Sequence, residues 1–177
     1  MSNTNQEIEL RLGRKGDAQN IARIHCRAIQ EIASNDYSEK ILNAWGRSLS
    51  KEELAKREEN FALRIKQEAN IIVVAEIDGK IAGFGEVSLQ ENELTALYVN
   101  PDFKRQGVGT AIAINLESRA KQSGSKYLKL HSSLTAESFY RRNGFQKRGD
   151  SYFGYRGTNG LRDYEKTDYQ QLICQLS

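Results

Sequence analysis

The feature that most constrains this chain is a pair of glycines that opens a helix directly after an apolar strand. The motif Gly107-Val108-Gly109 lies within Lys104–Thr110 and follows the strand Leu94–Val99. The first N–H groups of a helix lack intrahelical partners and lie at the positive end of its dipole. Glycine permits a tight turn and keeps Cβ atoms away from an approaching group. The motif therefore predicts a site where a pyrophosphate could rest.

A Gly-x-Gly turn is weak evidence by itself, because a strand-to-helix turn without a ligand can carry the same residues. A Walker loop would end in Gly-Lys-Ser/Thr, which is absent here. A Rossmann fingerprint would have a third glycine where Ile112 stands, and it would follow the first strand rather than the fourth expected one. The rest of the chain has to decide between these interpretations.

Length and composition favour a single domain over residues 1–177. Of these residues 38% are hydrophobic and 28% are charged, which is typical of a globular chain with a core. The net charge of +3 is too small to indicate nucleic-acid binding, and no apolar run is long enough to span a membrane. Cys26 and Cys174 lack metal-ligand spacing, so we expect no metal site, no disulfide and a cytoplasmic location.

Periodicity predicts an α/β chain with the order strand, helices, three strands, helix, strand, helix and two strands. Asp78-Gly79 is a strong signal for a hairpin turn, and Ser50-Lys51-Glu52-Glu53 is a capping box that opens a helix. The expected elements are strands at 8–12, 71–75, 81–85, 94–99, 127–131, 146–155 and 168–176, and helices starting at 18, 38, 50, 107 and 134.

A second block, Ser133–Phe145, completes a pattern that resembles the GNAT superfamily of N-acetyltransferases. The similarity runs from about Val73 to Phe145. It rests on Asp78-Gly79, Leu97-Tyr98-Val99, Asn100-Pro101, the Gly-x-Gly helix and Phe139-Tyr140 ahead of Gly144-Phe145. The segment from Ala28 to Trp45 is similar to small bacterial members of the YafP type.

The resemblance implies a mixed, mostly antiparallel sheet with helices on both faces and a central parallel pair of strands that splay apart. It also implies acetyl-CoA as cosubstrate, with the pantetheine arm between the strand ending at Val99 and strand 127–131, and the pyrophosphate on the amides of 105–110. The implied cofactor-binding residues are Leu97, Tyr98, Val99, Lys104, Arg105, Gln106, Gly107, Val108, Gly109, Thr110 and Ser133. Lys104 replaces the usual Gln or Arg, and Ser133 replaces an Asn that many members carry.

By the same resemblance, Tyr140 is the general acid that protonates the departing sulfur. A reference pKa of about 10 keeps a tyrosine protonated at neutral pH. General acid catalysis typically contributes about 10²–10⁴-fold. The competing interpretation is a core aromatic beside Phe139. Helical spacing predicts Ala136 and Phe139 as the buried pair, which would leave Tyr140 available for catalysis.

The sequence leaves several candidates for the general base. Glu93 lies at the start of the splayed strand, where some family members carry a catalytic Glu, but an exposed hairpin residue is the favoured interpretation. Glu86, on the neighbouring strand, is a second candidate for the base and for acceptor binding. His131 and a chain of waters are further alternatives, whereas His25 sits among apolar helix positions and is expected to be a satisfied core histidine.

The acceptor pocket is expected under the first helices. Tyr37 is a candidate for its wall and Asp36 for binding a cation, with a turn between helices as the simpler interpretation. Trp45 is expected to pack in the core.

The sequence thus predicts an acetyl-CoA-dependent N-acetyltransferase that acts by direct transfer to a primary amine. The acceptor is a small-molecule amine or a peptide, without nucleic-acid or membrane partners. A homodimer is left open. A non-catalytic CoA-binding or sensing domain on the same fold is the competing hypothesis. The identity of the acceptor is not encoded in any motif.

Overall fold

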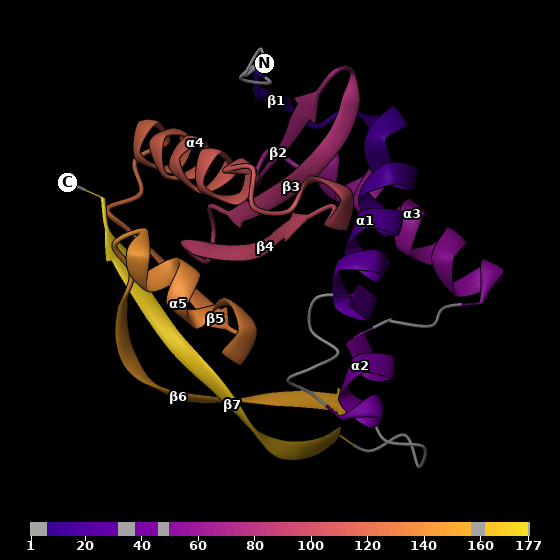
Figure 1. Cartoon of the computed structure of the whole chain (residues 1–177). Helices are drawn as coiled ribbons and strands as arrows, with labels where there is room; N and C mark the ends of the chain where they lie inside the picture. The colour runs from indigo at the N-terminus through magenta and orange to yellow at the C-terminus, as the bar shows by residue number, and fades with distance from the viewer. Residues whose placement is uncertain (1–6, 32–37, 46–49, 157–161, 177) are drawn as a thin grey trace, which may run out of the picture.

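The computed structural model describes residues 7–31, 38–45, 50–156 and 162–176. Its helices and strands follow the expected order (Figure 1). The N-terminal half contains β1 (Glu9–Leu12), η1 (Lys15–Asp17), α1 (Ala18–Glu31), α2 (Glu39–Trp45), α3 (Lys51–Ile65), β2 (Asn70–Ile77) and β3 (Lys80–Ser88). The C-terminal half contains β4 (Glu93–Val99), η3 (Pro101–Phe103), α4 (Val108–Gln122), β5 (Tyr127–Ser132), α5 (Leu134–Arg142), β6 (Gln146–Arg156) and β7 (Arg162–Gln175).

The strands form one seven-stranded sheet in the order β1-β2-β3-β4-β5-β7-β6. Within the described strands every neighbouring pair is antiparallel except β4 and β5, which are parallel. The predicted fold class, a mostly antiparallel sheet with one central parallel pair, is therefore confirmed. The last strand is longer than its pattern predicted, because β7 starts at Arg162 and continues the hairpin with β6.

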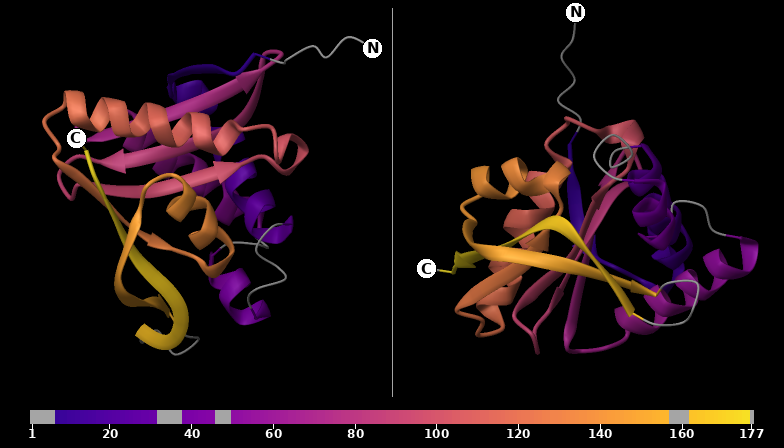
Figure 2. Two further views of the ribbon diagram at one scale, coloured as in Figure 1. Left: turned by 60° about the vertical axis from the view of Figure 1, so that its left-hand side comes forward. Right: turned by 90° about the horizontal axis from the view of Figure 1, so that it is seen from below.

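Helices cover both faces of the sheet, as Figure 2 shows in the view from below. On one face, Ile21 of α1 and Phe61 of α3 pack with Val74 and Phe84 of the sheet. On the other face, Ile112 and Leu116 of α4 are fully buried and share a cluster with the β2 side chains Val73 and Ala75. Because β2 is covered on both sides, its sequence is a continuous apolar run rather than an alternating one.

Local sequence signals explain where several elements begin and turn. The Ser50 hydroxyl accepts a hydrogen bond from the Glu53 N–H at 3.2 Å, and the Glu53 carboxylate accepts one from the Ser50 N–H at 2.8 Å, so the predicted capping box is present. Asp78 and Gly79 have φ values of 51° and 71°, as a two-residue hairpin turn with positive φ requires. Both predictions from short motifs are confirmed.

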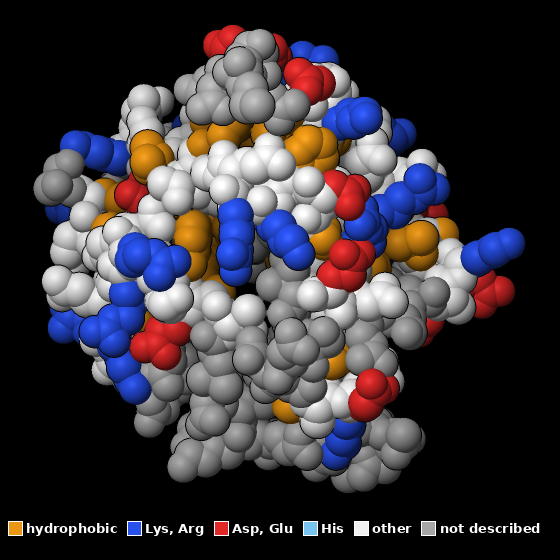
Figure 3. Space-filling model, viewed as in Figure 1, with side chains coloured by type: hydrophobic (Ala, Val, Ile, Leu, Met, Phe, Trp, Pro, Cys, Tyr) orange, Lys and Arg blue, Asp and Glu red, His pale blue; other side chains and the backbone are white. Residues whose placement is uncertain are grey.

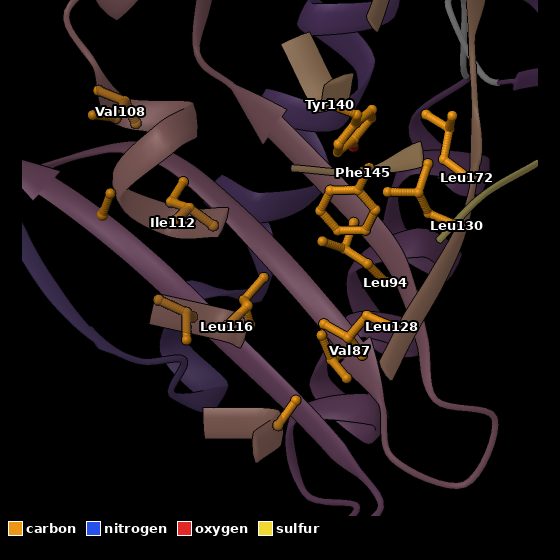
Figure 4. Packing of buried hydrophobic residues seen from close by; sticks show 14 of the residues in the cluster. Val87, Leu94, Val108, Ile112, Leu116, Leu128, Leu130, Tyr140, Phe145 and Leu172 are labelled. Atoms are coloured by element: carbon orange, nitrogen blue, oxygen red, sulfur yellow. The ribbon is translucent and has the colours of Figure 1, made fainter. Parts of the chain in front are cut away.

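Glycine allows α4 to lie close to the sheet. A Cβ on Gly85 of β3 would come within 2.7 Å of side-chain atoms of both Ile112 and Leu116. The helix axis is thereby set close over β3, and the first residues of α4 reach the carboxyl end of β4. The view in Figure 4 shows Val108, Ile112 and Leu116 of this helix pointing toward the sheet, beside the cluster that surrounds Tyr140.

Candidate functional site

The two edges of β4 are paired very differently. Toward β3 the register runs from Ser88↔Glu93 to Gly83↔Val99, whereas toward β5 it contains a single pair, Glu93↔Lys129. The Lys129 N–H donates to the Asn92 carbonyl at 2.9 Å at the same end. Beyond this point β4 and β5 diverge, so the predicted splay between the two strands is present. Backbone groups of β4 on that side are left without a neighbouring strand.

Strand alternation identifies which backbone groups face the opening. The Asn100 N–H donates to the Ala82 carbonyl at 2.8 Å, so the backbone of Asn100 points toward β3. Successive residues of a strand direct their N–H and C=O groups to opposite sides. The backbone groups of Val99 and Leu97 therefore point away from β3 and into the opening. These are the two residues that the resemblance implied as backbone contacts of the pantetheine arm.

A β-bulge lies next to the point where the strands part. The register of β3 with β4 shifts between Glu86↔Ala96 and Val87↔Leu94, which leaves Thr95 as the extra residue. Bulges increase local twist and bend the strand that carries them. The bulge thus gives a local physical reason why β4 turns away from β5.

The start of α4 presents free backbone donors beside this opening. Within the described residues, no N–H group from Arg105 to Thr110 donates a hydrogen bond, and the first bond of the helix runs from Ala111 N–H to Gly107 C=O at 3.0 Å. Gly107 is the N-cap, with φ +81° and no side-chain cap. A row of such donors at the positive end of the helix is suited to a phosphate.

The two glycines of the motif have different structural roles. A Cβ on Gly107 would meet nothing within 4 Å, and its positive φ is what requires glycine there. Gly109 is buried, and a Cβ on it would lie 3.3 Å from the Phe139 ring and 3.5 Å from Val99. Gly109 therefore allows α4, α5 and the end of β4 to meet, whereas the sequence suggested that both glycines make room for a ligand.

Tyr140 lies in the core beneath the opening and is only 7% exposed. Its ring contacts Phe139 and Phe145 edge-on, with centroids 5.1 and 5.6 Å away, and Figure 4 shows it above Phe145. The prediction that Ala136 and Phe139 are the buried pair of this helix is wrong, since both are only partly buried. Phe139 instead packs over Gly109 while Tyr140 turns inward.

The environment of Tyr140 keeps its phenol protonated. Burial raises the pKa of Tyr140 strongly, and the nearby Tyr98 phenol raises it further. No hydrogen-bond partner for the Tyr140 hydroxyl exists among the described residues. A buried polar group in this condition is uncommon in native proteins, and a catalytic role or an ordered water is a common explanation for it.

Ser133 is used by the fold itself. Its hydroxyl caps α5 by accepting a hydrogen bond from the Ala136 N–H at 3.2 Å. The buried Ser132 hydroxyl donates to the Ser133 carbonyl at 2.8 Å. The side chain that the resemblance placed at the cofactor therefore already has a structural hydrogen bond.

Glu86 is buried on the opposite face and is 1% exposed. The Arg64 guanidinium donates to both of its oxygens, from Nε to Oε1 at 2.8 Å and from Nη2 to Oε2. Burial raises the pKa of Glu86, and the charge and hydrogen bonds of Arg64 oppose that rise. With both oxygens bonded to Arg64, Glu86 links β3 to α3.

Glu93 lies at the closed end of the opening. Its carboxylate pairs with the Lys129 ammonium at 3.6 Å, where β4 and β5 still touch. Glu93 precedes Val99 by six residues, which corresponds to about 20 Å of strand. A role as base would require the carboxylate to leave Lys129. Tyr37 and Asp36 lie outside the described residues, as does the side chain of Trp45.

A partly buried aromatic and cationic layer behind β4 was missed by the sequence analysis. The side chain of Tyr98 faces α1, with its ring 4.5 Å from His25 and stacked at 5.6 Å on Phe84. His25 Nδ1 lies 2.5 Å from Arg57 Nη1 on α3. Burial, followed by the charges of Arg57 and Arg64, lowers the pKa of His25 to about 3, so this imidazole stays neutral.

The signal for this layer was the spacing of Arg57 and Arg64. Seven residues apart on a helix, they lie on one face, and in α3 that face is directed toward the sheet. Tyr98, which the resemblance assigned to the cofactor, contributes its side chain to this layer rather than to the α4 face. His25 has a partner, as expected for a core histidine.

Surface charge and metal-binding groups add little to the site. Lys and Arg are interspersed with Asp and Glu over the face in Figure 3. No group of His, Cys, Asp and Glu among the described residues could hold a metal ion. No helix within the described residues is both long and apolar enough to cross a membrane.

The splayed parallel pair in a mostly antiparallel sheet, next to a helix N-terminus with free donors, is the arrangement that the resemblance to acetyltransferases implied. Residues 33–159 match the family model described as an acetyltransferase (GNAT) domain. The chain therefore belongs to the GNAT family of acetyltransferases, which confirms the resemblance found in its motifs.

Individual relatives agree with this assignment. The uncharacterized N-acetyltransferase YafP of Escherichia coli (strain K12) is 32% identical over 142 residues, covering 78% of this chain and 81% of the relative. A GCN5-related N-acetyltransferase from Rhodopseudomonas palustris has a TM-score of 0.78 at 24% identity, covering 99% of this chain and 98% of the other. The PaiA N-acetyltransferase of Thermoplasma acidophilum, solved in complex with coenzyme A, has a TM-score of 0.74 at 20% identity, covering 96% and 99%.

Proposed function

We propose that this acyltransferase uses acetyl-CoA and transfers the acetyl group directly to a primary amine on a small molecule or a peptide. The observation that carries the proposal is the opening between β4 and β5, which lies between unpaired backbone donors and a buried phenol. Relatives solved with coenzyme A or acetyl-CoA share this fold, which supports the choice of cosubstrate.

The residues of the opening fit the parts of such a cosubstrate. The free N–H groups of 105–110 suit a diphosphate, and Lys104 and Arg105 add positive charge beside them. The outward backbone groups of Leu97 and Val99 suit the amide groups of a pantetheine arm, in the manner of an added strand. Tyr140 lies farther inside, below the opening.

Tyr140 is proposed to donate its phenolic proton to the departing sulfur. In the transfer the amine nitrogen forms a bond to the acetyl carbonyl carbon and the C–S bond breaks. The sulfur takes the Tyr140 proton, and the proton of the amine passes to water. A raised pKa keeps the phenol protonated until the thiolate develops. The phenolate then recovers its proton from solvent.

Water is the proposed carrier of the amine proton, because the two candidate carboxylates are engaged in ion pairs. Glu86 is held by Arg64 and Glu93 is paired with Lys129 at the closed end, whereas His131 stays an alternative base. The attacking amine would then lose its proton to a water in the opening rather than to a fixed base.

The experiment is an acceptor panel assayed by release of free thiol from acetyl-CoA, combined with calorimetry of coenzyme A binding to the same preparation. Small amines, amino acids and peptides with free N-termini form the panel. Thiol release with an amine, together with the acetylated product by mass spectrometry, supports the proposal. Binding of coenzyme A without thiol release from any acceptor would favour the sensing domain, and absence of binding would overturn the site.

A further inference from the structure

A single arginine of α1 reaches the segment between β4 and the glycine motif. Arg27 Nη1 and Nη2 donate to the two carboxylate oxygens of Asp102 at 2.9 and 3.0 Å. Nη1 also donates to Asn100 Oδ1 at 3.1 Å, and Nε donates to Glu31 at 3.1 Å. The guanidinium thus joins the C-terminal half of α1 to the cap and the central residue of a short turn that precedes the phosphate-binding loop.

The turn that Arg27 holds is η3, Pro101–Phe103. Asn100 caps it by accepting a hydrogen bond from the Asp102 N–H at 3.2 Å, and Pro101 is buried. The Lys104 N–H donates back to the Pro101 carbonyl at 3.3 Å. A fixed η3 therefore fixes the position of Lys104, where the loop that ends at Gly107 begins.

The loop that follows is in an unusual backbone conformation. Arg105 has φ +62° and Gly107 has φ +81°. A residue with a side chain is strained in the left-handed region, and such conformations persist only where the surroundings hold them. The free N–H groups of 105–110 depend on this conformation for their shared direction.

Few side chains are in a position to hold the segment. Among the described residues, Arg27 is the one side chain outside residues 100–109 that is seen to hydrogen-bond to it. Other anchors are the backbone bond from Asn100 N–H to Ala82 C=O and the apolar packing of Pro101, Phe103 and Val108. Because the Arg27 donors already have protein acceptors, this cation acts on the loop through Asn100 and Asp102.

We propose that Arg27 is a positioning residue that preorganises the pyrophosphate-binding loop for coenzyme A. The inference rests on the proposed function, since it requires that coenzyme A binds at 105–110. Loss of Arg27 allows η3 to move, and binding then has to restore the loop conformation at a cost in affinity. The chemical step at Tyr140 is not affected once the site is filled.

The test is the dissociation constant of coenzyme A for Arg27→Gln, measured by calorimetry beside wild type. Arg27 and Asp102 are 40% and 62% exposed, so a modest effect is expected from this forked pair. We expect binding weakened about 3- to 10-fold, which corresponds to about 0.7–1.4 kcal/mol. With acetyl-CoA varied, KM should rise by a similar factor while kcat stays unchanged.

Arg11 provides a matched control, because it forms a comparable ion network elsewhere. Its guanidinium donates to Asp17 at 2.7 and 3.0 Å and to Glu76 at 2.5 Å, beside β1. Arg11→Gln should leave the dissociation constant of coenzyme A unchanged, although it removes a similar set of ionic contacts. Unfolding midpoints of both variants show how much stability each network contributes.

Asp102→Asn and Arg27→Lys make the test independent of a single variant. Asp102→Asn should weaken binding as Arg27→Gln does, and the double variant should be no weaker than either single one. Arg27→Lys should recover part of the affinity, because an ammonium keeps the charge but not the fork. Wild-type affinity in Arg27→Gln, equal losses in Arg11→Gln, or additive losses in the double variant would overturn the inference. If wild type itself does not bind coenzyme A, the proposed function fails first.

Discussion

The two edges of β4 differ in how far they are paired with a neighbouring strand. Toward β3 the strand is paired along its length, and two pairs of polar side chains behind that region contact each other, Arg64 with Glu86 and Arg57 with His25. Toward β5 one residue pair is followed by open backbone, free helix donors and the Tyr140 hydroxyl, which has no hydrogen-bond partner among the described residues. Ion pairs and strand pairing predominate on the first side, and backbone donors without a described partner gather on the second.

This contrast separates residues that stabilise the fold from residues that serve a ligand. An isolated polar group in the interior costs free energy that folding has to offset elsewhere. Several such groups around one opening therefore mark a place where a second molecule completes the hydrogen bonds. Substitutions on the paired side should cost stability, and substitutions at the opening should cost activity.

The largest expected effect is on the open side, with Tyr140→Phe. Removal of the phenol should lower kcat about 10²–10⁴-fold, because the leaving sulfur loses its acid. The free energy of unfolding should hardly change, since the lost hydroxyl has no partner among the described residues. Thiol-release kinetics and urea denaturation measure the two quantities.

Tyr127→Phe is the control for Tyr140→Phe, because Tyr127 is an exposed tyrosine on β5. It should leave both kcat and stability at the wild-type values. Full activity of Tyr140→Phe across the pH range would contradict the assignment of the acid. It would leave the opening as a binding site alone.

The next largest effect is expected on the paired side, as a loss of stability in Glu86→Ala. Leaving Arg64 without its carboxylate should destabilise the protein by about 2–3 kcal/mol, below the usual cost of a broken buried pair because Arg64 is 39% exposed. Urea denaturation gives the value, with the exposed Glu91→Ala as control. A variant of wild-type stability that has lost acceptor binding would show that Glu86 belongs to the acceptor site.

The pH dependence of stability probes His25 in the same layer. In the unfolded chain this imidazole takes up a proton below its ordinary pKa of 6.5, whereas in the native protein its pKa is about 3. The unfolded state therefore binds more protons in this window, and stability falls as pH falls through it, by up to about 1.4 kcal/mol per pH unit. Above pH 6.5 His25 is neutral in both states, so it no longer lowers the free energy of unfolding.

Urea denaturation between pH 7 and pH 4.5 would measure this slope. His25→Gln, which can still accept a hydrogen bond but does not titrate, should flatten that part of the profile. His131→Gln, at an exposed position of β5, should leave it in place. Identical slopes in His25→Gln and wild type would show that His25 is not held neutral by the layer.

The smallest expected effect lies at the border between the two sides, with Ser133→Ala. Loss of the helix cap should cost about 1 kcal/mol of stability. If the hydroxyl serves only as the cap that accepts from the Ala136 N–H, the affinity for coenzyme A should not change. Calorimetry that showed weaker binding without a change in stability would restore the cofactor role that the resemblance implied.

Much of the fold could be predicted because its signals are local. The Asp78-Gly79 turn, the capping box at Ser50 and the order of elements each depend on neighbours in the chain. The Gly-x-Gly motif also located the helix start with free donors correctly. Burial was less predictable, since helical spacing could not decide whether Phe139 or Tyr140 faces the core.

The sequence by itself determined the family, the helix N-terminus at 107–110 and the class of chemistry, because each is written in contiguous residues whose physics is short-ranged. Only the tertiary structure decided which polar groups have partners. Arg64 forms an ion pair with Glu86, Lys129 pairs with Glu93, and Arg27 of α1 hydrogen-bonds to Asp102 of η3. Such pairings depend on packing between segments far apart in the chain, and no local pattern specifies them.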